Sequence, residues 1–69
     1  MKPILYTKPS CGGCIAAKRH LDRRGVEYET RSVLDHHEEL LAMGAMQAPV
    51  LVVGEAFYTG YRPDVIDAL

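Results

Sequence analysis

The stretch KPSCGGCIAAKRHLDRRG, residues 8–25, contains both cysteines of the chain, Cys11 and Cys14, with two glycines between them. The apolar run Ile4–Thr7 comes just before it and predicts a short buried β-strand. A C-x-x-C pair can form a structural disulfide, supply half of a metal site or act as a reactive thiol pair. The choice between these three depends on the local structure and on the rest of the chain.

The residues of this stretch that follow the first cysteine predict an α-helix. Cys14, Ala17 and Leu21 recur at the spacing of one helical face. Ser10 is a plausible N-cap for this helix, and Gly25 is well placed to end it. We therefore expect the thiol pair at a helix N-terminus, directly after a buried strand.

The rest of the chain continues this alternation. Asp35 and Glu38 resemble a capping box, and Gly44 is expected to end the helix that they begin. The expected elements are a strand over 26–33, a helix over 36–43, strands over 49–53 and 56–58, and a helix over 63–69. The order β-α-β-α-β-β-α predicts a single α/β domain over residues 1–69, with a four-stranded mixed sheet flanked by three helices.

The composition is that of one small globular domain. The 69 residues are 48% hydrophobic and 25% charged. The net charge of -1 gives no support to nucleic-acid binding, and no apolar run approaches the roughly 20 residues that span a bilayer. The N-terminus lacks the apolar core of a secretory signal, so we expect a cytoplasmic protein. In that compartment a cysteine pair is more often catalytic or metal-binding than structural.

A metal site is the weaker of these two alternatives. Tetrahedral zinc takes four ligands, and one C-x-x-C supplies two. The only other soft ligands are His20, His36 and His37, of which the first lies nearly opposite Cys14 on the predicted helix. We interpret all three histidines as exposed polar residues of helices and expect no metal. Two inert core cysteines are a further alternative, which the position at a helix N-terminus disfavours.

A reactive thiol pair fits the predicted position best. At a helix N-terminus the unpaired N–H groups and the helix dipole stabilise a thiolate, so the pKa of Cys11 can fall from about 8.5 to roughly 3.5–7.5. Cys14, one turn further on, lies on the same side and can attack a mixed disulfide formed on Cys11. We therefore expect Cys11 to be the nucleophile and Cys14 the resolving thiol of a thiol-disulfide oxidoreductase.

At this point the sequence resembles the short glutaredoxin-like proteins of the thioredoxin superfamily. The resemblance rests on YTKPSCGGC after the first strand, the helix behind it, QAPV before the third strand, and the order of the elements. It covers the whole chain, and it implies a thioredoxin-like (glutaredoxin) fold.

Within that group the chain is most similar to the NrdH-redoxins, which carry a W-S-G-F-R-P-D segment near the C-terminus. Residues 58–64 read YTGYRPD, which is identical at four of the seven positions. This resemblance implies an electron donor to class Ib ribonucleotide reductase that is reduced by thioredoxin reductase and has no bound cofactor. We expect a monomer with no nucleic-acid or membrane partner. The family usually has C-V-Q-C or C-M-Q-C where this chain has CGGC.

Glutathione-dependent glutaredoxins are the alternative. They typically carry C-P-Y-C, T-V-P and a paired-glycine-plus-aspartate turn that holds glutathione. This chain has Gly12–Gly13, Gln47–Ala48 and Thr59–Tyr61 at those places, so a strong glutathione site is not expected. A glutaredoxin that binds an iron-sulfur cluster through Cys11 across a dimer is a less favoured alternative.

The resemblance also implies further site residues. The Ala48–Pro49 bond would be cis and face the disulfide, which would leave the backbone of Ala48 free to pair with an extended substrate segment. The plainer interpretation is that Pro49 starts a strand. The remaining substrate- or partner-binding residues would be Lys8, Pro9, Thr59, Gly60 and Tyr61. Of these, Tyr61 and Pro9 could form an apolar rim, and Arg62 and Asp64 are expected to bond and hold the adjacent turn.

One residue of the wider superfamily is absent. Thioredoxins carry a buried aspartate six residues before the nucleophile, where it helps to deprotonate the resolving cysteine, and the corresponding position here is Leu5. The sequence offers no other buried acid for this task.

Overall fold

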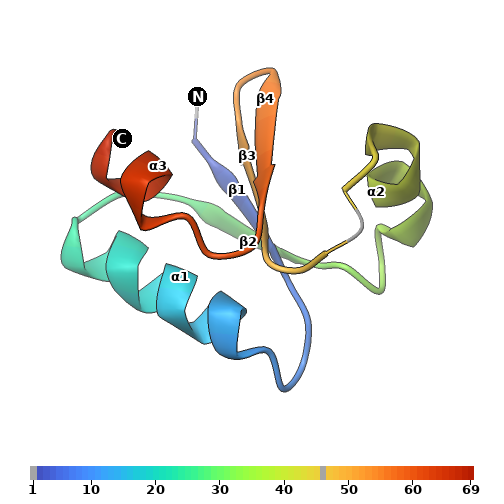
Figure 1. The fold of residues 1–69 in the computed structure, drawn as a ribbon, viewed down its shortest axis with the longest axis horizontal. Coiled ribbons are helices and arrows are strands. Elements are labelled where there is room, and N and C mark those ends of the chain that lie inside the picture. Colours follow the sequence, from blue (N-terminus) through green and yellow to red (C-terminus); the bar gives the residue numbers. More distant parts are fainter. Residues whose placement is uncertain (1, 46) are drawn as a thin grey trace.

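Four short strands form one mixed sheet (Figure 1). The computed structural model describes residues 2–45 and 47–69. The strands are β1 (Ile4–Thr7), β2 (Glu29–Ser32), β3 (Val50–Val53) and β4 (Ala56–Thr59), and their order in the sheet is β2-β1-β3-β4. β1 is parallel to β2, whereas β3 is antiparallel to both β1 and β4. The predicted mixed sheet and its β3–β4 hairpin are therefore confirmed.

Three helices cover the two faces of this sheet. They are α1 (Gly12–Arg23), α2 (His37–Met43) and α3 (Pro63–Asp67). Figure 1 shows α1 and α3 on one side of the strands and α2 on the other. The predicted element order is confirmed, and so is the thioredoxin-like fold that the resemblance implied.

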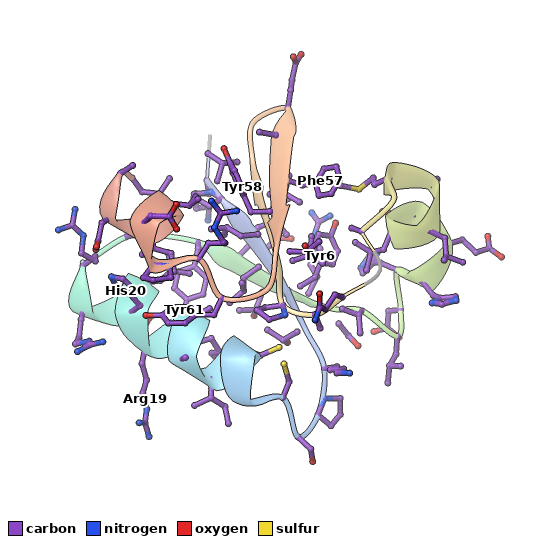
Figure 2. The ribbon with its side chains drawn as sticks, in the orientation of Figure 1. Tyr6, Arg19, His20, Phe57, Tyr58 and Tyr61 are labelled. Atoms are coloured by element: carbon purple, nitrogen blue, oxygen red, sulfur yellow. The ribbon has the colours of Figure 1, made fainter. Side chains whose placement is uncertain are left out.

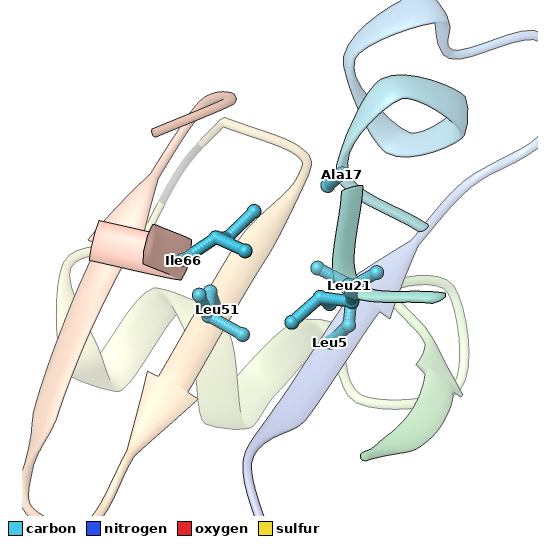
Figure 3. Packing of buried hydrophobic residues seen from close by; sticks show 5 residues of the cluster. All are labelled: Leu5, Ala17, Leu21, Leu51 and Ile66. Carbon is cyan, nitrogen blue, oxygen red and sulfur yellow. The ribbon is translucent and has the colours of Figure 1, made fainter. Parts of the chain in front are cut away.

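The alternation of side chains along the central strands explains this arrangement. Leu5 of β1 and Leu51 of β3 are register partners, and they pack with Ala17, Leu21 and Ile66 from α1 and α3 (Figure 3). The next register pair, Tyr6 and Val50, faces the opposite way and packs with Leu40 of α2 and with Ala45. Since successive side chains of a strand point to opposite faces, each face of the sheet receives one apolar cluster and one set of helices.

The strand expected over 26–33 and the helix expected over 63–69 are each shorter than predicted by two residues or more. The strand expected over 26–33 begins at Glu29, because the N–H of Val26 bonds to the carbonyl of Leu21 and completes the C-terminal cap of α1. Val26 and Tyr28 instead pack against the α1–α3 cluster. The last helix ends at Asp67 rather than continuing to Leu69.

Both predicted N-caps are wrong. Ser10 adopts a left-handed backbone, with φ 56°, and the N-cap of α1 is Cys11. α2 begins at His37 after an N-cap His36 that makes no capping bond, so Asp35 and Glu38 form no capping box. The C-terminal ends of α1 and α2 are as predicted. Gly25 follows the C-cap residue of α1, Gly44 is the C-cap of α2, and both take positive φ.

Candidate functional site

The sulfur of Cys11 takes the place of a capping hydroxyl. Cys11 has an extended backbone, and its Sγ accepts a hydrogen bond from the backbone N–H of Cys14 at 3.2 Å. In most helices a Ser, Thr, Asp or Asn oxygen accepts this bond from one of the unpaired N–H groups of the first turn. Both cysteines are free, and Cys14, at 3% exposure, is more buried than Cys11 at 8%. The outer thiol is thus the one placed to meet another molecule.

Several opposing effects act on the pKa of Cys11. Burial raises it, but hydrogen bonds from the Cys14 side chain and backbone and the positive charge of Lys8 lower it, and together they prevail. The net result is a lowered pKa, as expected for a thiol at a helix N-terminus. Lys8, itself exposed, acts here through its charge.

Cys14 is shifted in the opposite direction. Burial is the largest cause, and the hydrogen bond to Cys11 and the charge of that thiol add to it, which raises the pKa of Cys14 to about 11. The two thiols therefore differ in the way that a two-step exchange requires: one ionises readily, and the other keeps its proton.

Pro49 packs directly against the first turn of α1. The Ala48–Pro49 bond is cis, as the resemblance implied, and Pro49 is buried. A Cβ added to Gly13 would lie only 3.0 Å from Cδ of Pro49. Gly13 is therefore the residue that allows this close approach, whereas a Cβ at Gly12 would meet nothing within 4 Å.

The segment after β4 joins this arrangement. Thr59 is the register partner of Val50 at the end of the β3–β4 pair. The next residue, Gly60, has φ 76° and donates a 2.8 Å hydrogen bond to the carbonyl of Pro49. This brings the backbone at Tyr61 to α1, where its Cβ would be 3.9 Å from a Cβ on Gly13.

The predicted bond between Arg62 and Asp64 is also present. Nε and Nη2 of Arg62 donate to the two carboxylate oxygens of Asp64 at 3.1 and 2.9 Å. This bidentate pair holds the turn that leads into α3 and has no thiol chemistry of its own.

Lys8 and Pro9 lie on the loop before Cys11. Lys8 borders a cavity of about 180 Å³ that is also lined by Ala48, Leu40 and Val50. Pro9 lines a shallow groove with residues of β2, among them Thr30 and Ser32. Tyr61, in contrast, lies against α1. The apolar rim formed by Pro9 and Tyr61 therefore stays a prediction.

The interpretation of His20 as an exposed polar residue is wrong. Its side chain is only 12% exposed, and its two ring nitrogens bond to the hydroxyl of Tyr61 at 2.8 Å and to Oδ1 of Asp67 at 2.7 Å. The sequence contains only a weak indication of this contact: His20 falls seven residues after Gly13, so both residues lie on the same face of the helix.

Leu5 occupies the position at which thioredoxins carry an acid, and it is fully buried in the α1–α3 cluster. Within residues 2–45 and 47–69, no polar or charged side chain is buried.

Over the same residues, no three His, Cys, Asp or Glu side chains are grouped so that they could hold a metal ion. No helix in this part of the chain is both long and apolar enough to cross a bilayer.

Comparison with known proteins gives consistent matches. The model of the Glutaredoxin family matches residues 4–58. The glutaredoxin-like protein NrdH of Escherichia coli K12 is 36% identical over the whole chain, which covers 89% of that protein, and NrdH of Salmonella typhimurium is 38% identical with the same coverage.

The solved structures agree with the sequence matches. The structure of NrdH-redoxin from Escherichia coli superposes with a TM-score of 0.93 at 36% identity, covering all of this chain and 95% of that one. The thioredoxin-like protein BC3987, at 22% identity and a TM-score of 0.84, shares the fold.

Proposed function

The chain belongs to the glutaredoxin family, as an NrdH-like thiol-disulfide oxidoreductase, and from this we propose that it carries electrons from thioredoxin reductase to class Ib ribonucleotide reductase. Two findings support the proposal. The similarity to NrdH extends over the full chain, and the NrdH-redoxin of Escherichia coli is described as having a thioredoxin-like activity profile. We place the reaction in the cytoplasm and propose a monomer, formed as one domain over residues 1–69.

In the proposed reaction Cys11 is the nucleophile. Its thiolate attacks one sulfur of the substrate disulfide, which forms a mixed disulfide on Cys11 and releases the other substrate sulfur as a thiolate. Cys14 then attacks Sγ of Cys11, which releases the second substrate thiol and leaves a Cys11–Cys14 disulfide. The protein has lost two electrons and the substrate has gained two, and the reductase restores the dithiol.

The observation that carries these roles is the capping bond between the two cysteines. The N–H of Cys14 bonds to Sγ of Cys11 at 3.2 Å, so the thiolate forms at the outer cysteine, and the buried cysteine lies within one helical turn of it. We propose that Lys8 stabilises this thiolate, as its effect on the pKa of Cys11 supports. The redox-active disulfide would be the only cofactor.

The proposed partner-binding surface surrounds this thiol. Ala48, before the buried Pro49, would offer its backbone to an extended segment of the partner. The segment Thr59–Tyr61 would contact the same partner, because the Gly60–Pro49 bond holds it beside the first turn of α1. Pro9 would contribute from the loop before Cys11.

The source of electrons separates this proposal from the glutathione-dependent alternative. Insulin reduction would be followed with NADPH and thioredoxin reductase, and in parallel with NADPH, glutathione and glutathione reductase. We expect turnover in the first system and little in the second, and we expect the reduced protein to sustain ribonucleotide reductase. Turnover with glutathione alone would replace the proposed function by that of a glutaredoxin.

A further inference from the structure

A chain of hydrogen bonds connects α3 to His20 of α1 and continues to Tyr61. Asp67 of α3 bonds to Nε2 of His20 at 2.7 Å, and Nδ1 of His20 bonds to the hydroxyl of Tyr61 at 2.8 Å. The rings of His20 and Tyr61 meet edge to face, with centroids 5.9 Å apart. Figure 2 shows His20 and Tyr61 side by side along α1.

The two ends of Tyr61 touch α1 two turns apart. Its Cβ lies beside Gly13, and its hydroxyl reaches His20. Residues seven apart share one face of a helix, and their Cα atoms are about 10 Å apart along its axis. The phenol ring therefore lies lengthwise on this face, which is possible because the helix carries small residues there, Gly13 and Ala17, before His20.

His20 is itself held in place. Asp67 accepts from Nε2 of His20, and Nη2 of Arg24 donates to the backbone carbonyl of Asp67 at 2.9 Å. A carboxylate can only accept, so the proton of Nε2 points to Asp67 and leaves Nδ1 for Tyr61. A neutral His20 accepts from the Tyr61 hydroxyl, and a protonated His20 donates to it, so the link to Tyr61 persists in both states.

We propose that His20 is a positioning residue that fixes Tyr61 on α1 as a preformed aromatic contact for disulfide-bearing protein substrates. The inference rests on the proposed function, since it assigns Tyr61 to the partner-binding surface. Tyr61 stays 37% exposed although both of its ends are held. An aromatic side chain that is already immobile loses less rotamer freedom when a partner binds over it. A small disulfide that reaches only Cys11 would not use this contact.

The test compares protein and small-molecule disulfides in single turnover. Tyr61→Phe removes only the hydroxyl, and His20→Leu removes both bonds of the imidazole. Each variant is reduced chemically, freed of reductant and mixed with insulin or with Ellman's reagent. We expect the second-order rate constant with insulin to fall about 2- to 10-fold in both variants, with a change of less than about 2-fold for Ellman's reagent and an unchanged redox potential.

Two controls make the assignment specific. Arg19 is the exposed neighbour of His20 and points away from Tyr61 (Figure 2), so Arg19→Leu is expected to leave both rates unchanged. His20→Gln retains one donor and one acceptor and is expected to recover part of the insulin rate. The double variant Tyr61→Phe, His20→Leu should be no slower than the worse single variant, because both changes break the same hydrogen bond between positions 61 and 20.

The outcomes are separable. An unchanged insulin rate in Tyr61→Phe would overturn the inference, as would an equal loss with both disulfides. If His20→Leu does not fold, as judged by circular dichroism, Tyr61→Phe decides the question alone. Because no reductase takes part, a failure of thioredoxin reductase to reduce the wild-type protein would remove the proposed function and leave this measurement valid.

Discussion

The two glycines between the cysteines have different surroundings, and this predicts opposite effects of the same substitution. A Cβ at Gly12 would meet nothing within 4 Å, and this glycine is the first residue of α1. Gly12→Ala would restrict the unfolded chain without a steric cost, so we expect it to stabilise the protein by about 0.4–1 kcal/mol. Gly13→Ala restricts the unfolded chain equally, but its Cβ would lie 3.0 Å from Cδ of Pro49.

That contact must lengthen, because carbon atoms pack best at about 3.5–4.0 Å. Pro49 or the first turn of α1 would have to move by roughly 0.5 Å. Pro49 is buried, and its carbonyl accepts the Gly60 hydrogen bond, so it has little room to withdraw. Overpacking of this kind costs about 1–3 kcal/mol. Gly13→Ala should therefore be less stable than Gly12→Ala by about that amount.

The assay is urea unfolding of the two reduced variants and the wild type, followed by circular dichroism at equal temperature. For a chain of this size a difference of about 1 kcal/mol also corresponds to roughly 4–8 °C in Tm. The two alanine variants are each other's control, since they share the added methyl and adjacent positions. Equal stabilities, or a more stable Gly13→Ala, would refute the packing argument.

Four further predictions concern the thiols. Iodoacetamide should label Cys11 first, with a midpoint below the ordinary thiol pKa, whereas Cys14 of the free dithiol should ionise only near pH 11; equal labelling would contradict this order. Lys8→Gln should raise the pKa of Cys11 and slow its labelling at neutral pH, while Lys8→Arg should not. On non-reducing gels, Cys14→Ser should accumulate a mixed disulfide with a protein substrate and Cys11→Ser should not; equal trapping would reverse the assigned roles. Because folding raises the pKa of Cys14 to about 11, the folded dithiol holds more protons than the unfolded chain above about pH 9. Its free energy of unfolding should therefore fall as pH rises from there to about 11, and Cys14→Ala should reduce this loss.

The parts of the fold that were predictable from sequence depend on local signals. The buried run Ile4–Thr7 and the glycines that end α1 and α2 act over a few residues, and all were identified. The predicted cap of α1 failed because two chemically suitable groups compete. Ser10 has the preferred hydroxyl, but its left-handed backbone places Cys11 at the N-cap instead. Propensity alone does not resolve a one-residue choice of this kind.

The site also combines features that local sequence signals predict with features that they do not. The two cysteines are close because they are three residues apart, and this is visible in the sequence. The bond between His20 and Tyr61 joins residues 41 apart. It depends on how α3 and the segment after β4 pack on α1, which helical periodicity cannot specify. In sequence alone, the polar face of α1 therefore has the same pattern as an ordinary solvated surface.

The missing buried acid can be understood from the coupling between the two thiols. The second step of the proposed reaction needs Cys14 as a thiolate, yet its pKa of about 11 keeps it protonated in the free dithiol. Two of the causes of that value are the hydrogen bond to Cys11 and the charge on Cys11. Once Cys11 is bonded to a substrate sulfur it carries no charge, so the effect of that charge disappears and the hydrogen bond to Cys11 weakens.

The remaining effects on the pKa of Cys14 are burial, which raises it, and the backbone hydrogen bond and charge of Lys8, which lower it. In the proposed reaction we therefore expect the pKa of Cys14 to fall when the mixed disulfide forms, and the departing substrate thiolate is an available base. The first covalent step of the proposed reaction thus favours ionisation of Cys14. The proposed reaction is compatible with Leu5 at the position of the acid, because its first step removes the Cys11 charge that opposes ionisation of Cys14.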